Sequence, residues 1–195
     1  FCCSGCFSAY RKSYVMPKLE EWVNEKFMGR NIIFGDDRAL TNVIIRQKYK
    51  TVYVDEALAY TIVPDTFKKF IKQQVRWKKG WFINSIRILP FAIKNEKFIA
   101  FTYLIPQTII ALATPFIAFK ALFINPLFLG ISPWIYILGV YLISVMLYMH
   151  YLLYQEGERK YGKYIFLWST LNLTLLSYII LYALYDLRNM SWGTR

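Results

Sequence analysis

The sequence predicts a mixed α/β domain followed by interfacial and transmembrane α-helices. Hydrophobic residues make up 56% of the 195 residues and aromatic residues 19%, which is above the usual range for a soluble globular domain. Between Phe98 and Gln155 the only charged residue is Lys120, whereas residues 1–97 hold 18 of the 24 Lys and Arg residues. A polar, basic first half therefore precedes a membrane-embedded second half.

Residues 1–80 are expected to contain both strands and helices. Four short runs are predicted to be strands: residues 1–10, 32–34, 51–54 and 57–63. Helices or helical turns are predicted at residues 17–27 and from Asp36 onward, where Leu40, Val43 and Ile44 recur at helical spacing. Because the two kinds of element alternate, we expect this segment to be of the α/β class.

A long helix is predicted after Pro64, with Asp65 or Thr66 as its N-terminal cap. Four cations recur in it at steps of three, four and three and therefore share one face: Lys69, Lys72, Arg76 and Lys79. The following stretch, residues 81–97, is strongly apolar and is interrupted by Pro90. It is predicted to be an amphipathic helix that lies along the membrane surface.

Residues 98–187 are predicted to form the membrane region of a multi-pass protein. Two spans are expected near residues 98–119 and 133–154, and Pro106 and Pro115 are expected to kink the first. The link 155–163 is more basic than the link 120–132, so it should face the cytoplasm together with the basic first half. The third apolar stretch, residues 164–185, has a polar middle and either spans the membrane or dips in and returns.

The formal charge of +12 leaves several partners open. Nucleic acid, anionic lipid headgroups and phosphate or sugar-nucleotide anions would each suit it, and the positive-inside rule alone also produces a basic cytoplasmic part. Nucleic acid is disfavoured because the cations precede membrane spans. Cys2, Cys3 and Cys6 are the only cysteines, and the only histidine, His150, lies far from them in the sequence. A zinc site needs four ligands, so zinc binding is not expected.

The first motif that indicates chemistry is Gly35-Asp36-Asp37-Arg38, at a predicted strand-to-helix turn. A carboxylate in this place can point into a cleft and take a proton from an attacking hydroxyl. An acidic residue at the start of a helix also commonly acts as a cap. The motif alone leaves both roles open.

The second motif is Gln73-Gln74-Val75-Arg76-Trp77 on the cationic helix. An amide, a guanidinium and an indole can converge there on one ligand, because the three side chains lie on adjacent parts of one side. The planar fork of Arg suits a diphosphate, and the flat face of Trp suits a sugar ring. Arg and Trp are also enriched at membrane surfaces without such a role.

The third motif, Trp192-Gly193-Thr194-Arg195, ends the tail 188–195. The order of the three motifs resembles that of family 2 glycosyltransferases of the hyaluronan synthase group, and of the related chitin synthases and chitin-oligosaccharide synthases. The resemblance covers essentially the whole chain. It implies that residues 1–80 are the C-terminal part of a GT-A type glycosyltransferase domain.

The resemblance also implies a role for each motif residue. Asp37, beside Asp36, would be the general base that deprotonates the acceptor hydroxyl. Gln73 and Arg76 would hold the diphosphate of the donor, and Trp77 would form the floor under the acceptor sugar.

Two further segments receive roles in the same way. Trp192 and Arg195 would close over the diphosphate from the tail. The acceptor or donor pocket near the membrane entrance would be lined by a short loop, Cys3, Ser4 and Gly5. Gly5 is followed here by Cys6, where many hyaluronan synthases have proline.

By the same resemblance, the protein would be a plasma-membrane enzyme that transfers sugars from UDP-N-acetylglucosamine, and from UDP-glucuronate if the product is hyaluronan. The growing polymer would leave through a channel of membrane segments. Mg²⁺ or Mn²⁺ would be held by a DxD motif, which this chain lacks, so the ligands are expected in an N-terminal half and the chain alone is expected to be inactive. A chitin-type product and a non-catalytic export subunit are the alternatives.

Overall fold

The computed structural model describes residues 2–3, 5–54, 57, 59–154 and 161–190. The chain forms two compact units. The first comprises residues 1–108 and 182–195, and the second comprises residues 109–181. Each unit is described by itself below.

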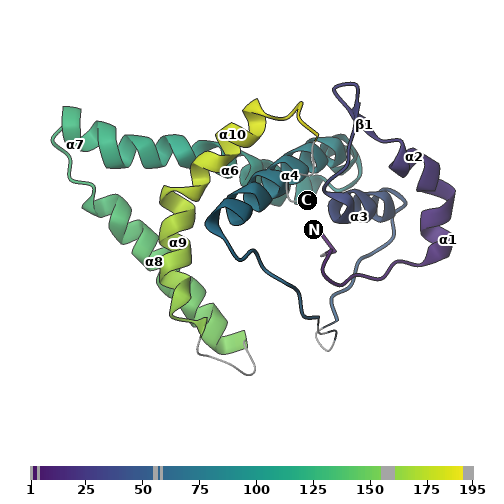
Figure 1. Cartoon of the computed structure of the whole chain (residues 1–195), viewed down its shortest axis with the longest axis horizontal. Helices are drawn as coiled ribbons and strands as arrows, with labels where there is room; N and C mark the ends of the chain where they lie inside the picture. The colour runs from purple at the N-terminus through teal and green to yellow at the C-terminus, as the bar shows by residue number, and fades with distance from the viewer. Residues whose placement is uncertain (1, 4, 55–56, 58, 155–160, 191–195) are drawn as a thin grey trace. The chain divides into compact units, whose positions relative to one another are not determined.

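The first unit begins with short elements and continues with two longer helices (Figure 1). Their bounds are α1 Lys12–Val15, a 3₁₀ turn Met16–Lys18, α2 Leu19–Val23, β1 Lys26–Phe27, β2 Arg30–Asn31, α3 Asp36–Arg46 and α4 Phe67–Asn95. β1 and β2 form an antiparallel hairpin whose two turn residues, Met28 and Gly29, both have positive φ. Helical turns are present as far as Val23 of the predicted stretch 17–27, whose last two residues instead form β1, and the helix predicted from Asp36 is present.

The expected α/β class is not confirmed, because the described chain is mostly helical. The hairpin is the only strand pair among the described residues. Strands were predicted at residues 1–10, 32–34, 51–54 and 57–63, but the described residues of these four segments do not form strands. Residues 51–54 and 59–63 are instead exposed, with Tyr53 91% and Ile62 97% accessible. A strand needs a neighbour to satisfy its backbone groups, and the described residues offer these segments no strand to pair with.

Helix α4 is a single helix of 29 residues that runs through both the predicted cationic helix and the predicted interfacial stretch 81–97 as far as Asn95. Thr66 caps it, since its side-chain oxygen accepts the backbone N–H of Lys69. Several residues of α4 are buried: Gln74, Lys79, Gly80, Ile83, Asn84, Ile88 and Ala92. The apolar ones among them join Phe34, Ala39 and Ile44 in the core of the first unit.

Among the described residues, two helices are long and apolar enough to cross a membrane. The first, Lys97–Phe128, continues beyond the end predicted near residue 119. It consists of α5 Lys97–Ile99, a π turn Ala100–Leu104, α6 Ile105–Phe119, a π turn Lys120–Ile124 and α7 Asn125–Phe128. Pro106 and Pro126 each follow closely on a π turn. A wider turn accommodates a residue that cannot donate its backbone nitrogen, so neither proline ends the helix.

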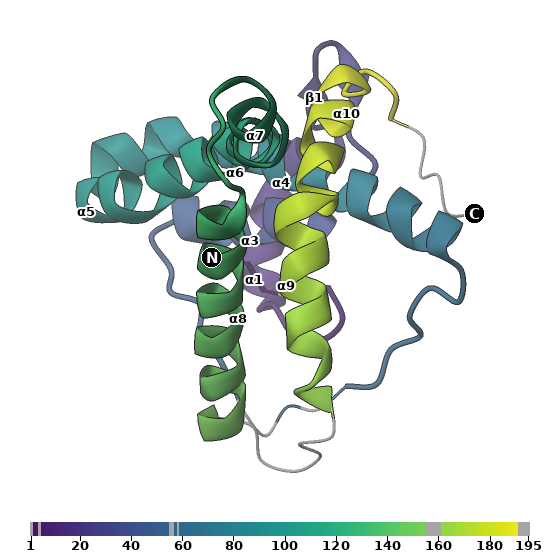
Figure 2. The same cartoon turned by 90° about the vertical axis from the view of Figure 1, so that its left-hand side faces the viewer.

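The second candidate span lies within α8 Trp134–Tyr154, which runs beside α9 Tyr164–Thr174 (Figures 1 and 2). After α9 the chain bends by 46° and continues as a 3₁₀ turn Leu176–Tyr178 and α10 Ile179–Tyr185. The Tyr136 hydroxyl of α8 donates to the backbone oxygen of Leu173 just before this bend, at 2.8 Å. Within the stretch 164–185, the Thr174 hydroxyl donates to the backbone oxygen of Thr170 and the Ser177 hydroxyl to that of Leu173, so part of its polar middle satisfies backbone groups around the bend.

Candidate active site

The N-terminal loop lies across the first turn of α3. The thiol of Cys2 donates to Oδ2 of Asp37 at 3.5 Å, and the backbone N–H of Cys3 donates to Oγ1 of Thr41 at 3.0 Å. Gly5 approaches the same carboxylate, because a Cβ placed on it would stand 3.4 Å from the Cβ of Asp37. The structure therefore brings the predicted loop residues Cys3 and Gly5 to the predicted general base.

Thr41 fixes this arrangement from inside α3. It is completely buried, and its hydroxyl donates to the backbone oxygen of Asp37 at 2.7 Å. The hydroxyl of Tyr10 lies 3.2 Å from the Thr41 oxygen and 3.4 Å from the Asp37 backbone oxygen. Sequence reasoning assigned no role to Thr41, which follows Asp37 by four residues on the same helix.

The two acidic residues of the first motif occupy the first turn of α3. Asp36 is exposed and Asp37 is half-buried, and Oδ1 of Asp37 accepts the backbone N–H of Arg38 at 2.8 Å. One oxygen of the Asp37 carboxylate thus accepts a backbone N–H of the first turn, while the other faces the N-terminal loop. Asp37 can therefore cap the helix and still act as a general base.

Arg76 of α4 lies within electrostatic reach of both carboxylates. Burial lowers the pKa of its guanidinium, and the negative charges of Asp36 and Asp37 oppose that effect. A guanidinium stays protonated despite such a shift. The structure thus places a fixed positive charge opposite the predicted general base, as binding of an anionic donor next to an acceptor hydroxyl requires.

The other residues of the second motif are more open. Gln73 is half-buried, and Trp77 is 54% exposed on the surface of α4. Within the described part of the chain, neither side chain forms a hydrogen bond with Asp37. Their predicted roles, to hold the diphosphate and to support the acceptor, stay predictions.

The relative position of α3 and α4 is set by a contact between two glycines. Gly35 adopts a left-handed conformation with φ of 76°, and a Cβ on it would stand 3.0 Å from the Cα of Gly80. A Cβ on Gly80 would stand 3.1 Å from the Cα of Gly35. The absence of both side chains lets the start of α3 rest directly on the backbone of α4, one turn after Arg76.

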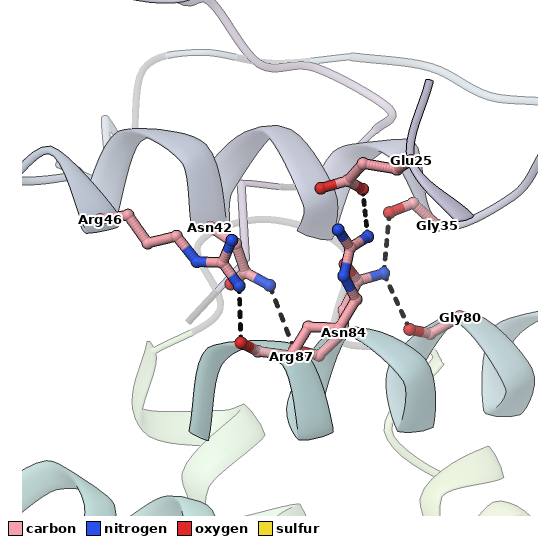
Figure 3. A network of polar contacts seen from close by, with 7 residues as sticks. All are labelled: Glu25, Gly35, Asn42, Arg46, Gly80, Asn84 and Arg87. Atoms are coloured by element: carbon pink, nitrogen blue, oxygen red, sulfur yellow. Dashed lines mark hydrogen bonds and ion pairs between the residues drawn. The ribbon is translucent and has the colours of Figure 1, made fainter. Parts of the chain in front are cut away.

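Polar side chains reinforce this contact (Figure 3). The amide nitrogen of Asn84 donates to the backbone oxygens of Gly35 at 3.2 Å and Gly80 at 3.0 Å. Farther along α3, Asn42 donates to the backbone oxygen of Asn84 at 3.1 Å, and Arg46 donates to that of Arg87 at 2.5 Å. The side chain of Arg87 is in turn paired with Glu25, which follows α2. These bonds hold Asp37 and Arg76 at a defined separation.

A pocket of about 360 Å³ lies beside α3. Its lining includes Arg38 of the first motif together with Asn42, Lys48, Asn84 and Tyr103. None of the residues to which the resemblance assigns a role lines it. The half-buried Asp37 and Arg76 therefore lie outside this pocket.

Three predicted residues, Ser4, Trp192 and Arg195, lie outside the described residues. Within the described residues no group of three or more His, Cys, Asp or Glu side chains could hold a metal ion. The expected divalent metal and its ligands stay predictions.

Comparison with known proteins relates the site to a family. Residues 3–90 match the chitin synthase-like glycosyltransferase domain. The chain is 30% identical over 194 residues to a hyaluronan synthase of Streptococcus pyogenes serotype M1, covering 99% of this chain and 45% of that protein. It is 29% identical to an N-acetylglucosaminyltransferase of Rhizobium meliloti over 197 residues, covering 100% of this chain and 45% of that protein.

A second N-acetylglucosaminyltransferase, from Azorhizobium caulinodans, is 29% identical over 195 residues, which cover 48% of its length. The chain thus spans about half the length of the curated relatives that it matches. No solved structure matches it significantly. The matched segment includes Cys3, Asp37, Arg76 and Trp77. Residues 3–90 of this chain therefore match the chitin synthase-like glycosyltransferase domain, and the resemblance indicated by the three motifs is confirmed.

Proposed function

We propose that this chain is the C-terminal part of a membrane enzyme that polymerises UDP-sugars into a β-linked polysaccharide containing N-acetylglucosamine. The observation that supports this function most directly is that the guanidinium of Arg76 on α4 lies within electrostatic range of a half-buried carboxylate, Asp37, on α3. In the proposed reaction the Asp37 carboxylate accepts a proton, and the Arg76 guanidinium holds the diphosphate of the donor.

The proposed reaction is an inverting transfer. The acceptor hydroxyl attacks the anomeric carbon of the UDP-sugar, its proton moves to the Asp37 carboxylate, and the bond from the anomeric carbon to the diphosphate oxygen breaks. Negative charge grows on the departing UDP. Arg76 stabilises this charge through paired N–H donors that stand in place before the reaction begins, and Arg195 adds a second guanidinium.

The remaining assignments follow the resemblance. Gln73 assists Arg76 at the diphosphate, and Trp77 offers an exposed indole face on which the apolar side of an acceptor sugar can stack. The apolar helices 97–128 and 134–153 belong to the membrane region through which the polymer would leave. The catalytic part would face the cytoplasm, where UDP-sugars are made.

Hyaluronan is the first candidate product, and it requires two donors, UDP-N-acetylglucosamine and UDP-glucuronate. The N-acetylglucosaminyltransferases of Rhizobium and Azorhizobium favour a second candidate, a chitin-type polymer or oligosaccharide made from UDP-N-acetylglucosamine alone. Both candidates use the same chemistry at Asp37 and Arg76. They differ in whether a carboxylated donor is needed.

One experiment separates these products. Membranes that contain the full-length protein are supplied with labelled UDP-N-acetylglucosamine, with and without UDP-glucuronate, and the polymer is treated with hyaluronidase or chitinase. Polymer that needs both donors and is degraded by hyaluronidase would establish hyaluronan. Polymer from the single donor that is degraded by chitinase would establish the chitin-type product. Absence of polymer with any UDP-sugar would favour a non-catalytic export subunit.

A further inference from the structure

The pocket beside α3 lies where the polar part of the chain meets the first apolar helix. Three parts of the chain line it: α3 with the residues that follow it, the second half of α4, and residues 99–107 at the start of the candidate span Lys97–Phe128. All of the lining residues belong to the first compact unit. Because the first turns of a span lie at the level of the lipid headgroups, the pocket would open there.

The lining has an apolar part and a cationic part. The apolar part comes mainly from α4 and from the start of the span, and it includes Phe91 and Leu104. The cationic part comes from α3 and the residues after it, and it consists of Arg38, Lys48 and Lys50. An anionic phospholipid presents the same two chemistries to a protein, because its negatively charged headgroup is joined to acyl chains.

Within the described part of the chain, the three cations of the lining take part in no ion pair. The only acidic residue of the lining is Glu96. Cations therefore outnumber carboxylates around the pocket, and the local field attracts an anion.

The backbone at Lys48 supports a task for this side chain. Lys48 directly follows the C-terminal cap of α3 and has a φ of 65°, in the left-handed region where glycine is usual. A residue with a Cβ is strained in this conformation. Such strain is kept mainly where the side chain contributes to function.

We propose that this pocket binds one anionic phospholipid, with its phosphate at Arg38, Lys48 and Lys50 and an acyl chain in the apolar part. The pocket volume of about 360 Å³ is within the range of ligand sites, roughly 300–1,000 Å³. It is too small for a whole phospholipid, so the remaining chain length would lie along the membrane helix. A free phosphate anion would leave the apolar part unfilled. This inference goes beyond the proposed transfer reaction and does not depend on it.

The test measures lipid binding to the full-length protein, purified in a mild detergent. The protein is titrated with phosphatidylglycerol or phosphatidylcholine, and native mass spectrometry counts the lipid that stays bound. One phosphatidylglycerol should be retained in preference to phosphatidylcholine. Lys48→Gly and Lys50→Gln should each weaken its binding by about fivefold, the effect of one cation near an anionic surface. Glu96→Gln should strengthen it, because this change removes the carboxylate of the lining.

Two controls separate lipid binding from folding and from general surface attraction. Because glycine relieves the left-handed backbone, the Tm of Lys48→Gly without added lipid should not fall. Lys94→Gln is the matched charge control, since Lys94 is an exposed cation near the end of α4 that does not line the pocket. It should leave phosphatidylglycerol binding unchanged.

Three results would overturn the proposal. Equal weakening by Lys94→Gln would show a general attraction to the basic surface. Unchanged binding by Lys48→Gly and Lys50→Gln would show that Lys48 serves only the end of the helix. Displacement of the lipid by glycerol phosphate would show a site for a free phosphate anion. Phosphatidylglycerol binding by a protein that makes no polymer would contradict the proposed function and leave the lipid site in place.

Discussion

Asp37 shares its environment with a thiol that should stay protonated. Burial of the Cys2 thiol and the negative charge of Asp37 raise the pKa of Cys2 from 9.0 to about 11. Because the folded state binds this proton more tightly than the unfolded state, the stabilisation is complete below pH 9 and is lost as the pH rises towards 11. At neutral pH the thiol therefore donates to the carboxylate.

This pKa gives a test of the loop's position. In a variant with Cys3→Ser and Cys6→Ser, the rate of Cys2 alkylation by iodoacetamide should keep rising up to about pH 11, because the thiolate is the reactive form. Asp37→Asn should move this profile to lower pH by removing the neighbouring negative charge. Identical profiles in the two proteins would show that the loop does not lie against Asp37.

At Arg76, the shape of the side chain should matter as much as its charge. Arg76→Lys keeps one positive charge but loses the planar fork, so we expect UDP binding to weaken by about tenfold, the effect of losing one charged hydrogen bond. Binding can be measured by titration of the purified full-length protein with UDP. Lys69→Arg, at the exposed start of the same helix, is the control and should bind UDP normally. Normal UDP affinity of Arg76→Lys would remove Arg76 from the diphosphate site.

The residues of the candidate site were predictable to different degrees. Asp37 and Arg76 could be found because the chemistry of their motifs requires particular side chains at particular spacings. Lys79 and Asn84 could not be assigned, because helical spacing says which face a side chain occupies and does not say what packs against that face. Their partners, Asp186 and Gly35, are distant in sequence.

At the scale of single elements, helices were easier to predict than strands. The start of α3 at Asp36 and the Thr66 cap of α4 follow from local signals, because helix caps and helix bonds join residues a few positions apart. The segments 51–54 and 57–63 carry the side chains of strands, but a strand is completed by a partner. The residue types of a segment indicate its preference for the extended conformation, but they do not show whether a neighbouring strand is present to pair with it.

The α3–α4 contact depends on the small size of Gly80. In Gly80→Ala the new Cβ would meet the backbone of Gly35 at 3.1 Å, which cannot move aside like a flexible side chain. We expect the cost of overpacking, about 1–3 kcal/mol, to exceed the helix-propensity gain of about 1 kcal/mol. Thermal unfolding of the purified protein should show a lower Tm. Gly139→Ala, where the added Cβ meets nothing within 4 Å, should not lower it.

At the scale of the whole molecule, the ion pair between the Lys79 ammonium and the Asp186 carboxylate constrains membrane topology. Two contacting residues lie on the same side of the membrane, so the chain between them must cross an even number of times. The helices 97–128 and 134–153 can supply two crossings. The bent pair 164–174 and 176–185 should therefore return to the side from which it starts.

This topology can be mapped with single cysteines in a protein that lacks Cys2, Cys3 and Cys6. In intact cells, a membrane-impermeant maleimide should label Ser132→Cys, in the link between the two candidate spans. It should label Lys163→Cys and Arg188→Cys only after the cells are opened. External labelling of Arg188→Cys would mean that the bent pair crosses the membrane and that the tail cannot reach Arg76.

The central claim is that Asp37 performs chemistry at the α3–α4 junction, and its most direct test is sugar incorporation by Asp37→Asn in the full-length protein. Loss of the general base should slow polymer synthesis by about 10²–10⁴-fold while UDP affinity stays close to normal. Asp65→Asn, an exposed carboxylate before α4, serves as the control and should retain full activity. Polymer synthesis by Asp37→Asn at the rate of the unaltered protein would contradict the proposed mechanism and favour a non-catalytic role for this site.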